Sequence, residues 1–398
     1  IFIAVFAVVN YEKRAAIVVQ NLRLNKQRLT AFGLAALIVW GVSYMKADRW
    51  ILQPYIMTVR SVPHTSREIT FDEESAVYTI QADEGDFKIL HLTDIHLGGS
   101  AFSAYKDYKA LDACYRLIRH TEPDLVVITG DMVFPLGIQS LSLNNTAPVM
   151  QFASFMRNVG IPWAFTYGNH DTESMASGSR AEIAELYESL SLARGGNVLY
   201  ANAHTNISGR SNQMITIVNP DGSVRQALFL IDSNDYTGLG FSDYDFIHDD
   251  QVEWYKEQVD RLCDEEGHLI SSLAFFHIPL QQYRTAWELY EQGSDEVTYF
   301  FGENGEKLYD KVCCSEYPSA FFDTARELGS TQAMFCGHDH FNNISLEYQG
   351  IRLTYGMSID YLATPGTDKS DVQRGATLIT LHRDSSYDIE QVPFTSLP

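Results

Sequence analysis

The sequence predicts a layered α/β fold, and three observations support this prediction. Short apolar runs typical of buried strands alternate with longer stretches whose apolar residues recur at helical spacing. Several apolar runs stop at polar residues, as strands do where a ligand-binding rim forms at their carboxyl ends. The 398 residues, 45% hydrophobic and 20% charged, have a globular composition, and the motifs below span residues 94–340, which favours one large domain.

The expected elements follow one another in a regular order. Residues 87–92 predict a strand, and apolar residues at helical spacing over 108–118 predict the next helix. A second strand is expected over 125–129, followed by a helix over 149–159 and a strand over 161–166. This alternation is typical of layered α/β proteins.

A further helix has a clear amino-terminal signal. Ser179 and Glu182 have the spacing of a capping box, and Gly195-Gly196 is expected to close the segment. Three more apolar runs that end at polar residues are predicted as strands: residues 227–231, 273–276 and 333–335.

The charge of the chain is strongly uneven. The formal net charge is −22, yet residues 1–50 hold seven basic and two acidic side chains. Residues 51–398 therefore carry 22 basic against 49 acidic side chains. A body this acidic repels nucleic-acid backbones, so general nucleic-acid binding is not expected. An anionic substrate remains compatible with it, because bound metal ions can reverse the local potential.

Residues 1–50 are predicted to anchor the protein in a membrane. The first nine residues look like the end of an apolar segment, a basic stretch follows over 11–29, and residues 31–45 carry no charge. Fifteen uncharged residues are slightly fewer than the roughly 20 of a spanning helix, but aromatic and basic residues flank them. Because basic segments stay in the cytoplasm, the rest of the chain is expected on the extracytoplasmic side of the cell membrane.

Two other interpretations of residues 31–45 are open, namely the apolar core of a cleaved signal peptide and a packed helix of the globular domain. The predicted organisation is a membrane anchor over 1–50, a linker with an edge strand over 51–85, and the main domain over 86–398.

Five of the predicted strand ends carry residues that bind metals well. Each short motif, such as D-x-H or G-D, occurs by chance in many proteins, but this ordered set at successive strand ends does not. The candidate residues are Asp94 and His96 (DIH), Asp131 (GD), Asn169 and His170 (GNHD), His277 (HIP), and His338 and His340 (GHDH).

The residues in and around these motifs resemble those of the calcineurin-like metallophosphoesterases. The segments FKILHLTDIH, PDLVVITGD, PWAFTYGNHD, FFHIPL and FCGHDHFN are most similar to the branch related to purple acid phosphatases that includes the Dcr-type phosphoesterases. The resemblance covers residues 86–383 and implies a four-layer α-β-β-α sandwich, with two mixed sheets flanked by helices.

The resemblance also implies a role for each motif residue. His170 would stand beside the site as the general acid or as the group that positions the phosphate. Asp131 would bridge two metal ions. One ion would be held by Asp94, His96 and His340, and the other by Asn169, His277 and His338.

Elementary chemistry agrees with a pair of metal ions. Phosphate esters hydrolyse very slowly in water, and two cations about 3.5–4 Å apart can clamp the attacking and leaving oxygens of an in-line displacement. Water activated there ionises near neutral pH and supplies the hydroxide. Nitrogen and oxygen ligands suit manganese, iron or zinc, divalent or mixed-valent, without choosing among them.

One position departs from the related families. Purple acid phosphatases carry a tyrosine three residues after the bridging aspartate, where this chain has Phe134, so a coloured ferric-phenolate site is not expected. Serine/threonine protein phosphatases carry there an aspartate that orients the catalytic histidine. Asp171 is a candidate to orient His170 instead, and the alternative is a capping or supporting role in the following segment.

The predicted function is hydrolysis of phosphate esters, with monoesters slightly favoured. The alternative is a phosphodiesterase that acts on nucleotide, lipid or cell-envelope phosphodiesters. A binding protein that keeps the metals without catalysis is a further alternative, against which the complete set of motif residues argues.

Overall fold

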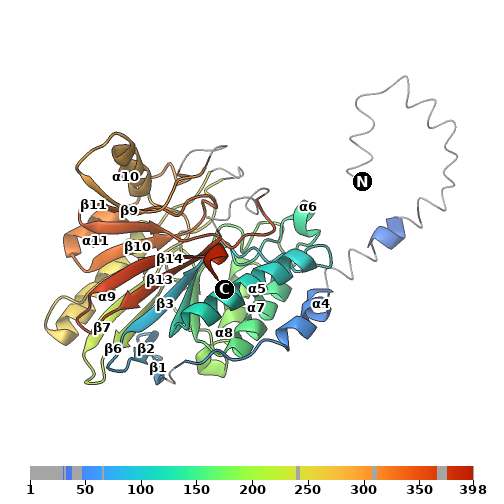
Figure 1. Cartoon of the computed structure of the whole chain (residues 1–398), viewed down its shortest axis with the longest axis horizontal. Helices are drawn as coiled ribbons and strands as arrows, with labels where there is room; N and C mark the ends of the chain where they lie inside the picture. The colour runs from blue at the N-terminus through green and yellow to red at the C-terminus, as the bar shows by residue number, and fades with distance from the viewer. Residues whose placement is uncertain are drawn as a thin grey trace.

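Two β-sheets packed face to face form the centre of the protein, and helices cover both outer faces (Figure 1). The computed structural model describes residue 30 and residues 33–37, 47–64, 67–238, 243–306, 312–364 and 374–397. Within this part of the chain the predicted two-sheet α/β sandwich is confirmed.

The smaller sheet carries the amino-terminal half of the motifs. Its neighbours β3, β4 and β5 run parallel, so their carboxyl ends reach the same edge. In spatial order its strands are β14 (Tyr387–Pro393), β13 (Gly375–Leu381), β3 (Phe87–Leu92), β4 (Leu125–Thr129) and β5 (Trp163–Thr166).

The larger sheet has a parallel centre, formed by β7, β8, β10 and β12. Its flanking pairs are antiparallel except for β2 and β6, which run parallel. In spatial order its strands are β1 (Ile69–Asp72), β2 (Val77–Gln81), β6 (Gln213–Val218), β7 (Val224–Leu230), β8 (Ser272–Phe275), β10 (Thr331–Cys336), β12 (Ile351–Tyr355), β11 (Ser345–Tyr348) and β9 (Val297–Phe301).

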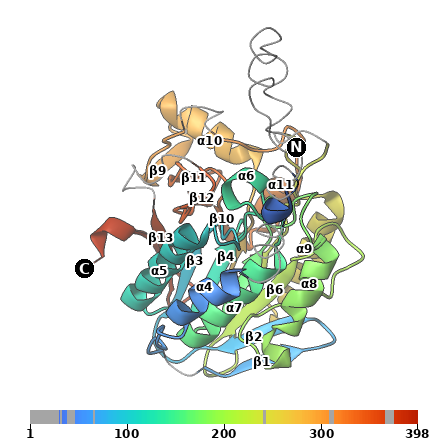
Figure 2. The same cartoon turned by 90° about the vertical axis from the view of Figure 1, so that its right-hand side faces the viewer.

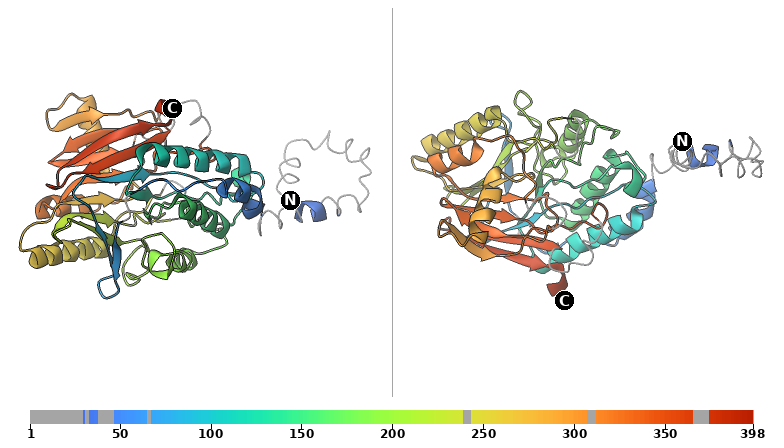
Figure 3. Two further views of the ribbon diagram at one scale, coloured as in Figure 1. Left: turned by 60° about the horizontal axis from the view of Figure 1, so that its bottom comes forward. Right: turned by 90° about the horizontal axis from the view of Figure 1, so that it is seen from above.

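The helices form two separate outer layers, which Figures 2 and 3 show from other sides. One apolar core joins the smaller sheet to α4 (Ala47–Ile56), α5 (Ala104–Thr121), α7 (Thr146–Val159) and α8 (Arg180–Ser189). A second joins the larger sheet to α9 (Asp249–Glu266), α10 (Gln281–Glu291) and α11 (Phe321–Leu328). Three short helices are also described: α6 (Gly137–Ser140), η1 (Leu192–Arg194) and η3 (Phe394–Ser396).

Strand β3 shows why its sequence forms a strand between two layers. Phe87 and Ile89 lie in the core between the sheets, whereas Leu90 and Leu92 lie in the core beneath the helices. Alternate side chains of a strand point to opposite faces, so a strand buried on both faces is apolar almost throughout.

The elements that the sequence predicted are confirmed to within a few residues, whereas helices α9, α10 and α11 and strands β11 to β14 were not predicted. The capping box is confirmed, since Ser179 accepts a hydrogen bond from the backbone of Glu182 and the Glu182 side chain accepts one from the backbone of Ser179. The helix ends at Ser189, however, and Gly195 closes the short helix η1 instead, with φ 86°. A glycine is suited to that left-handed conformation.

The segment before the sheets packs against the main body. Leu52 and Ile56 of α4, with Val59 and Val62 after it, are buried in the core shared with α5 and α7. None of the helices in the described residues is long and apolar enough to cross a membrane. Most of residues 31–45 lies outside the described residues, so the membrane anchor and the extracytoplasmic location remain predictions.

Candidate metal centre

The motif residues converge on one rim of the sandwich. They follow the carboxyl ends of β3, β4 and β5 in one sheet and of β8 and β10 in the other. Because all five strands end at this rim, residues up to 244 positions apart come into contact, as His96 and His340 do. Such a rim is where layered α/β proteins bind ligands.

Four motif residues have a backbone conformation that side chains other than glycine rarely adopt. The φ angles are 53° for Asp94, 53° for His96, 50° for Asp131 and 76° for His338. Each such residue costs about 1–3 kcal/mol, a cost that folded proteins tolerate mainly at functional sites. The strain is therefore independent support for a functional site at this rim.

Two glycines allow the rim loops to approach one another closely. A Cβ atom on Gly168 would lie 2.2 Å from Asp131 Oδ1, and one on Gly337 would lie 1.9 Å from Thr93 Oγ1. Any larger residue would push the loops apart, so both glycines are needed to bring the motifs together.

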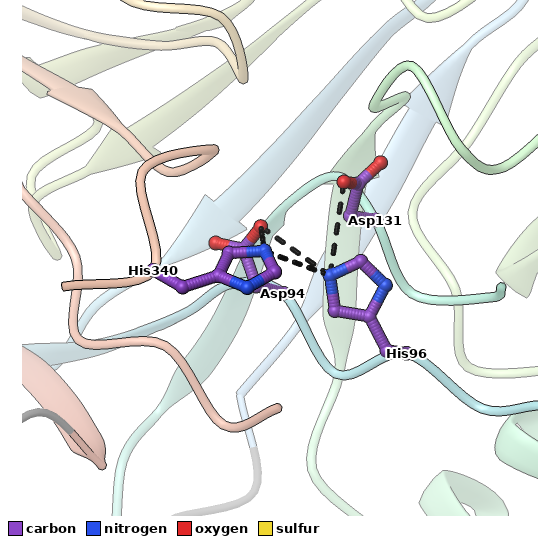
Figure 4. Close-up of side chains that lie close together, drawn as sticks. All are labelled: Asp94, His96, Asp131 and His340. Carbon is purple, nitrogen blue, oxygen red and sulfur yellow. Dashed lines mark hydrogen bonds and ion pairs between the residues drawn. The ribbon is translucent and has the colours of Figure 1, made fainter. Parts of the chain in front are cut away.

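Asp94, His96, Asp131 and His340 form the first group of side chains (Figure 4). His96 Nε2 lies 3.0 Å from His340 Nε2 and 3.8 Å from Asp131 Oδ2. Asp94 Oδ1 lies 3.3 Å from His340 Nε2. Two ligands bonded at 2.0–2.2 Å to one ion lie about 3.0–3.5 Å apart, so this spacing suits a shared cation.

Asp131, His277 and His338 form the second group, and Asn169 lies beside them. His277 Nε2 is 3.2 Å from Asp131 Oδ2, 3.2 Å from Asn169 Oδ1 and 3.3 Å from His338 Nδ1. Like the first group, this one offers its donor atoms at distances that suit one cation.

Asp131 joins the two groups through a single oxygen. Its Oδ2 faces both His96 and His277, whereas its Oδ1 accepts a hydrogen bond of 2.8 Å from the backbone of His170. One carboxylate oxygen between two sets of donors is the arrangement that a pair of close cations requires.

The electrostatics of the cluster also favour cations. Burial lowers the pKa of His277, but the facing carboxylate of Asp131 outweighs burial and raises that pKa to about 9, so a bound cation would replace the ring proton beside this carboxylate. Asp94 Oδ1 is buried 3.3 Å from His340 Nε2 and 3.7 Å from His96 Nε2, so a cation shared with these two rings would neutralise its charge. Burial and the nearby His277 lower the pKa of His338 to about 3, so this ring is neutral and free to bind a metal.

Neighbouring groups orient the histidine rings. His277 donates from Nδ1 to the carbonyl oxygen of Thr129 at 2.8 Å, which leaves Nε2 to face the cluster. His340 Nδ1 contacts Thr364 and lies 3.2 Å from Asp360 Oδ2, so its Nε2 also faces inward. Such partners fix the tautomer and the direction of metal-binding imidazoles.

His170 stands beside the cluster and has a carboxylate partner of its own. Its Nδ1 donates to Glu173 Oε1 at 2.6 Å, and Glu173 is buried. Partial burial lowers the pKa of His170, but Asp131 and then Glu173 raise it above its usual value. The Phe134 ring packs edge-on against both His170 and His96, with centroids 4.9 and 5.2 Å apart.

Of the two roles considered for Asp171 from the sequence, the structure favours support of the backbone over orientation of His170. Its carboxylate accepts hydrogen bonds from the backbone N–H groups of Asp131, Val133 and Gly168, at 3.0, 3.0 and 2.7 Å. Three amide donors hold it beneath the loops, so it supports the turn, and Glu173 is the residue that contacts His170.

Sequence reasoning missed several residues that contact the motif residues, among them Glu173, Asp360 and Tyr236. Glu173 lies three positions after His170, a spacing that could have indicated the contact. Asp360 and Tyr236 reach His340 and Asn169 from distant loops, and no local pattern indicates them.

Comparisons with known proteins agree with this geometry. A family model described as "Calcineurin-like phosphoesterase" matches residues 87–342. A protein named "Probable inactive purple acid phosphatase 28", from Arabidopsis thaliana, is 27% identical over 308 residues, which cover 71% of this chain and 72% of the relative. "Phosphatase DCR2" from Saccharomyces cerevisiae is 30% identical over 281 residues, which cover 67% of this chain and 46% of the relative.

A solved structure shares the fold. The crystal structure of a dimetal phosphatase from Danio rerio superposes with a TM-score of 0.50 and 12% identity, covering 77% of this chain and 96% of that chain. At this identity the likeness concerns the fold alone.

Proposed function

Because this chain belongs to the calcineurin-like phosphoesterase family, in the branch related to purple acid phosphatases and the Dcr-type phosphatases, we propose that it hydrolyses phosphate monoesters at a two-metal centre. The family is one of metal-dependent hydrolases of phosphoric esters. Preference for monoesters is the finer part of the proposal, and the name phosphatase on the yeast relative supports it.

The observation that carries the proposal is the position of Asp131 Oδ2, 3.8 Å from His96 Nε2 and 3.2 Å from His277 Nε2. In the proposed centre, Asp94, His96 and His340 hold one ion, and Asn169, His277 and His338 hold the other. Bound manganese, iron or zinc ions would supply Lewis acidity, which lowers the pKa of water and neutralises phosphoryl charge.

The chain itself contributes positioning and a proton. The carboxylate of Glu173 holds His170 by Nδ1, so Nε2 is the ring nitrogen that remains to meet the ester. From there His170 can donate a proton to the leaving oxygen or a hydrogen bond to the phosphoryl group. The Phe134 ring limits rotation of His170 and keeps it beside the cluster.

Metal removal and reconstitution test the function directly. The chain stripped with a chelator is expected to hydrolyse no aryl phosphate, and activity is expected to return with two ions of Mn²⁺, Fe²⁺ or Zn²⁺ per chain. Elemental analysis and turnover of an aryl phosphate against a bis-aryl phosphate measure the two parts of the proposal. Faster turnover of the bis-aryl phosphate would indicate a phosphodiesterase. Two bound ions without turnover of either ester would indicate a non-catalytic protein. The Arabidopsis relative is itself named as probably inactive.

Replacing Glu173 tests the role of His170. Glu173→Ala is expected to slow hydrolysis of an ester with a poor leaving group about 10²-fold. Without the hydrogen bond to Glu173, the His170 ring would direct Nε2 toward the leaving oxygen less often. An ester with a good leaving group, which needs little protonation, is expected to change little and serves as the internal control. Glu173→Gln keeps an acceptor oxygen for Nδ1, so it should recover part of the loss.

His170→Ala is expected to show the same dependence on the leaving group as Glu173→Ala. The double variant should lose no more than His170→Ala alone, because the two residues act as one unit. Equal losses on both esters in Glu173→Ala would mean that Glu173 supports the loop and not the orientation of His170.

A further inference from the structure

Two paired segments that follow β7 reach the second group of metal-binding candidates. After β7 the chain forms a bridge between Tyr236 and Tyr244, whose rings stack with centroids 6.0 Å apart. The Tyr244 ring lies edge-on to His338 at 4.4 Å. The tyrosine hairpin, as we call residues 235–238 and 243–245, therefore lies over the half of the cluster that contains His338 and Asn169.

Tyr236 contacts the amide of Asn169 directly. The amide nitrogen Nδ2 donates to the Tyr236 hydroxyl oxygen at 2.7 Å, while Oδ1 lies 3.2 Å from His277 Nε2. An amide offers one accepting and one donating end, and only the oxygen can bind a metal ion. With Nδ2 on Tyr236, Oδ1 is the end that faces the cluster.

Asn169 has little freedom to compensate for the loss of this contact. Its side chain is almost fully buried, at 1% exposure, so water does not readily replace a missing partner of Nδ2. Hydrogen bonds to the far side of a ligand also make its metal-binding atom a better donor.

A buried polar network holds the tyrosine hairpin in place. Asn234, with φ 64°, donates from Nδ2 to the carbonyl oxygen of Phe246 at 2.8 Å and to Gln251 Oε1 at 3.0 Å. Gln251 in turn donates to the carbonyl oxygen of Asp232 at 2.6 Å. These bonds fix both ends of the hairpin, so Tyr236 is positioned before any ligand binds.

We propose that Tyr236 is a positioning residue that holds the Asn169 amide toward the second metal ion and thereby sets the affinity of that site alone. The inference rests on the proposed two-metal function, and it extends the metal site to a loop 67 residues away in the sequence. Tyr236 acts through Asn169 and is not assigned a contact with the ions.

Calorimetric titration of the chelator-treated whole chain with Mn²⁺ tests this inference without measuring activity. The wild type is expected to bind two ions. Tyr236→Phe, which removes only the hydroxyl, is expected to weaken one of the two sites about 10–100-fold and to leave the other unchanged. Tyr78→Phe is the matched control, because it removes a hydroxyl that donates to the Tyr200 carbonyl oxygen and not to a metal-binding candidate, and both sites should keep wild-type affinity.

A double-mutant cycle identifies which site is affected. Asn169→Ala is expected to weaken the same site, and adding Tyr236→Phe to it should cause no further loss, since the amide is already gone. Wild-type affinities in Tyr236→Phe, equal weakening of both sites, or additive losses in the double variant would overturn the inference and leave the proposed function intact. A wild type that binds fewer than two ions would overturn both.

Discussion

Asp131→Ala is expected to abolish binding of the ion pair and to lower kcat/KM by at least about 10³-fold, since each metal contributes several kcal/mol to the barrier reduction. Asp131 Oδ2 faces His96 of the first group and His277 of the second, at 3.8 and 3.2 Å, and Oδ1 accepts a hydrogen bond from the backbone of His170. Removing the carboxylate therefore separates the two sites and releases the loop of the candidate acid.

Asp131→Asn separates these two effects. An asparagine keeps an oxygen that can accept from the His170 backbone but loses the negative charge between the cations. Asp124→Ala is a matched control, because Asp124 precedes the same strand β4 at its opposite end and pairs with Arg67 at 2.7 Å. This variant is expected to lose stability while keeping two ions per chain. Elemental analysis and kcat/KM measure both outcomes, and an Asp131→Ala protein that retains two ions would refute the bridging role.

Asp171→Ala is expected to lower the free energy of unfolding by at least about 3 kcal/mol. Its carboxylate satisfies three backbone N–H groups from the turns after β4 and β5, and each buried donor left without a partner costs about 1–3 kcal/mol. Asp171 is 4% exposed, so bulk water does not reach these donors in the folded protein.

Urea denaturation of the metal-free chain measures this effect apart from metal affinity. Asp171→Asn keeps one acceptor oxygen, so its loss should be intermediate. Unchanged unfolding in Asp171→Ala, combined with slower hydrolysis, would instead support the role of orienting His170. The structure favours the first result because Glu173 already occupies Nδ1 of that ring.

The sequence was sufficient to predict the site because the motifs lie at the ends of predictable strands. A strand such as β3 is recognisable from a short apolar run, and the residues after it are carried to the rim by the parallel arrangement of β3, β4 and β5. The order of the motifs along the chain then identified the family. Local pattern also located the capping box at Ser179 and Glu182.

The direction in which a side chain points within a turn could not be predicted in the same way. Asp171 is the nearest carboxylate to His170 in the sequence, yet three amide donors from two strand ends draw it away. Glu173, three residues on, reaches the ring instead. Both outcomes depend on groups that meet only when β4 and β5 are already side by side.

By itself the chain's sequence determined which residues follow the strand ends at the rim, since the position of each strand along the chain and the point where it ends depend on local apolar pattern and polar termination. The tertiary structure alone decided which atoms face the cluster. Tyr236 and Asp360 approach Asn169 and His340 from loops far away in the sequence, and they select the inward-facing atom of each through contacts that exist only after the two sheets have packed.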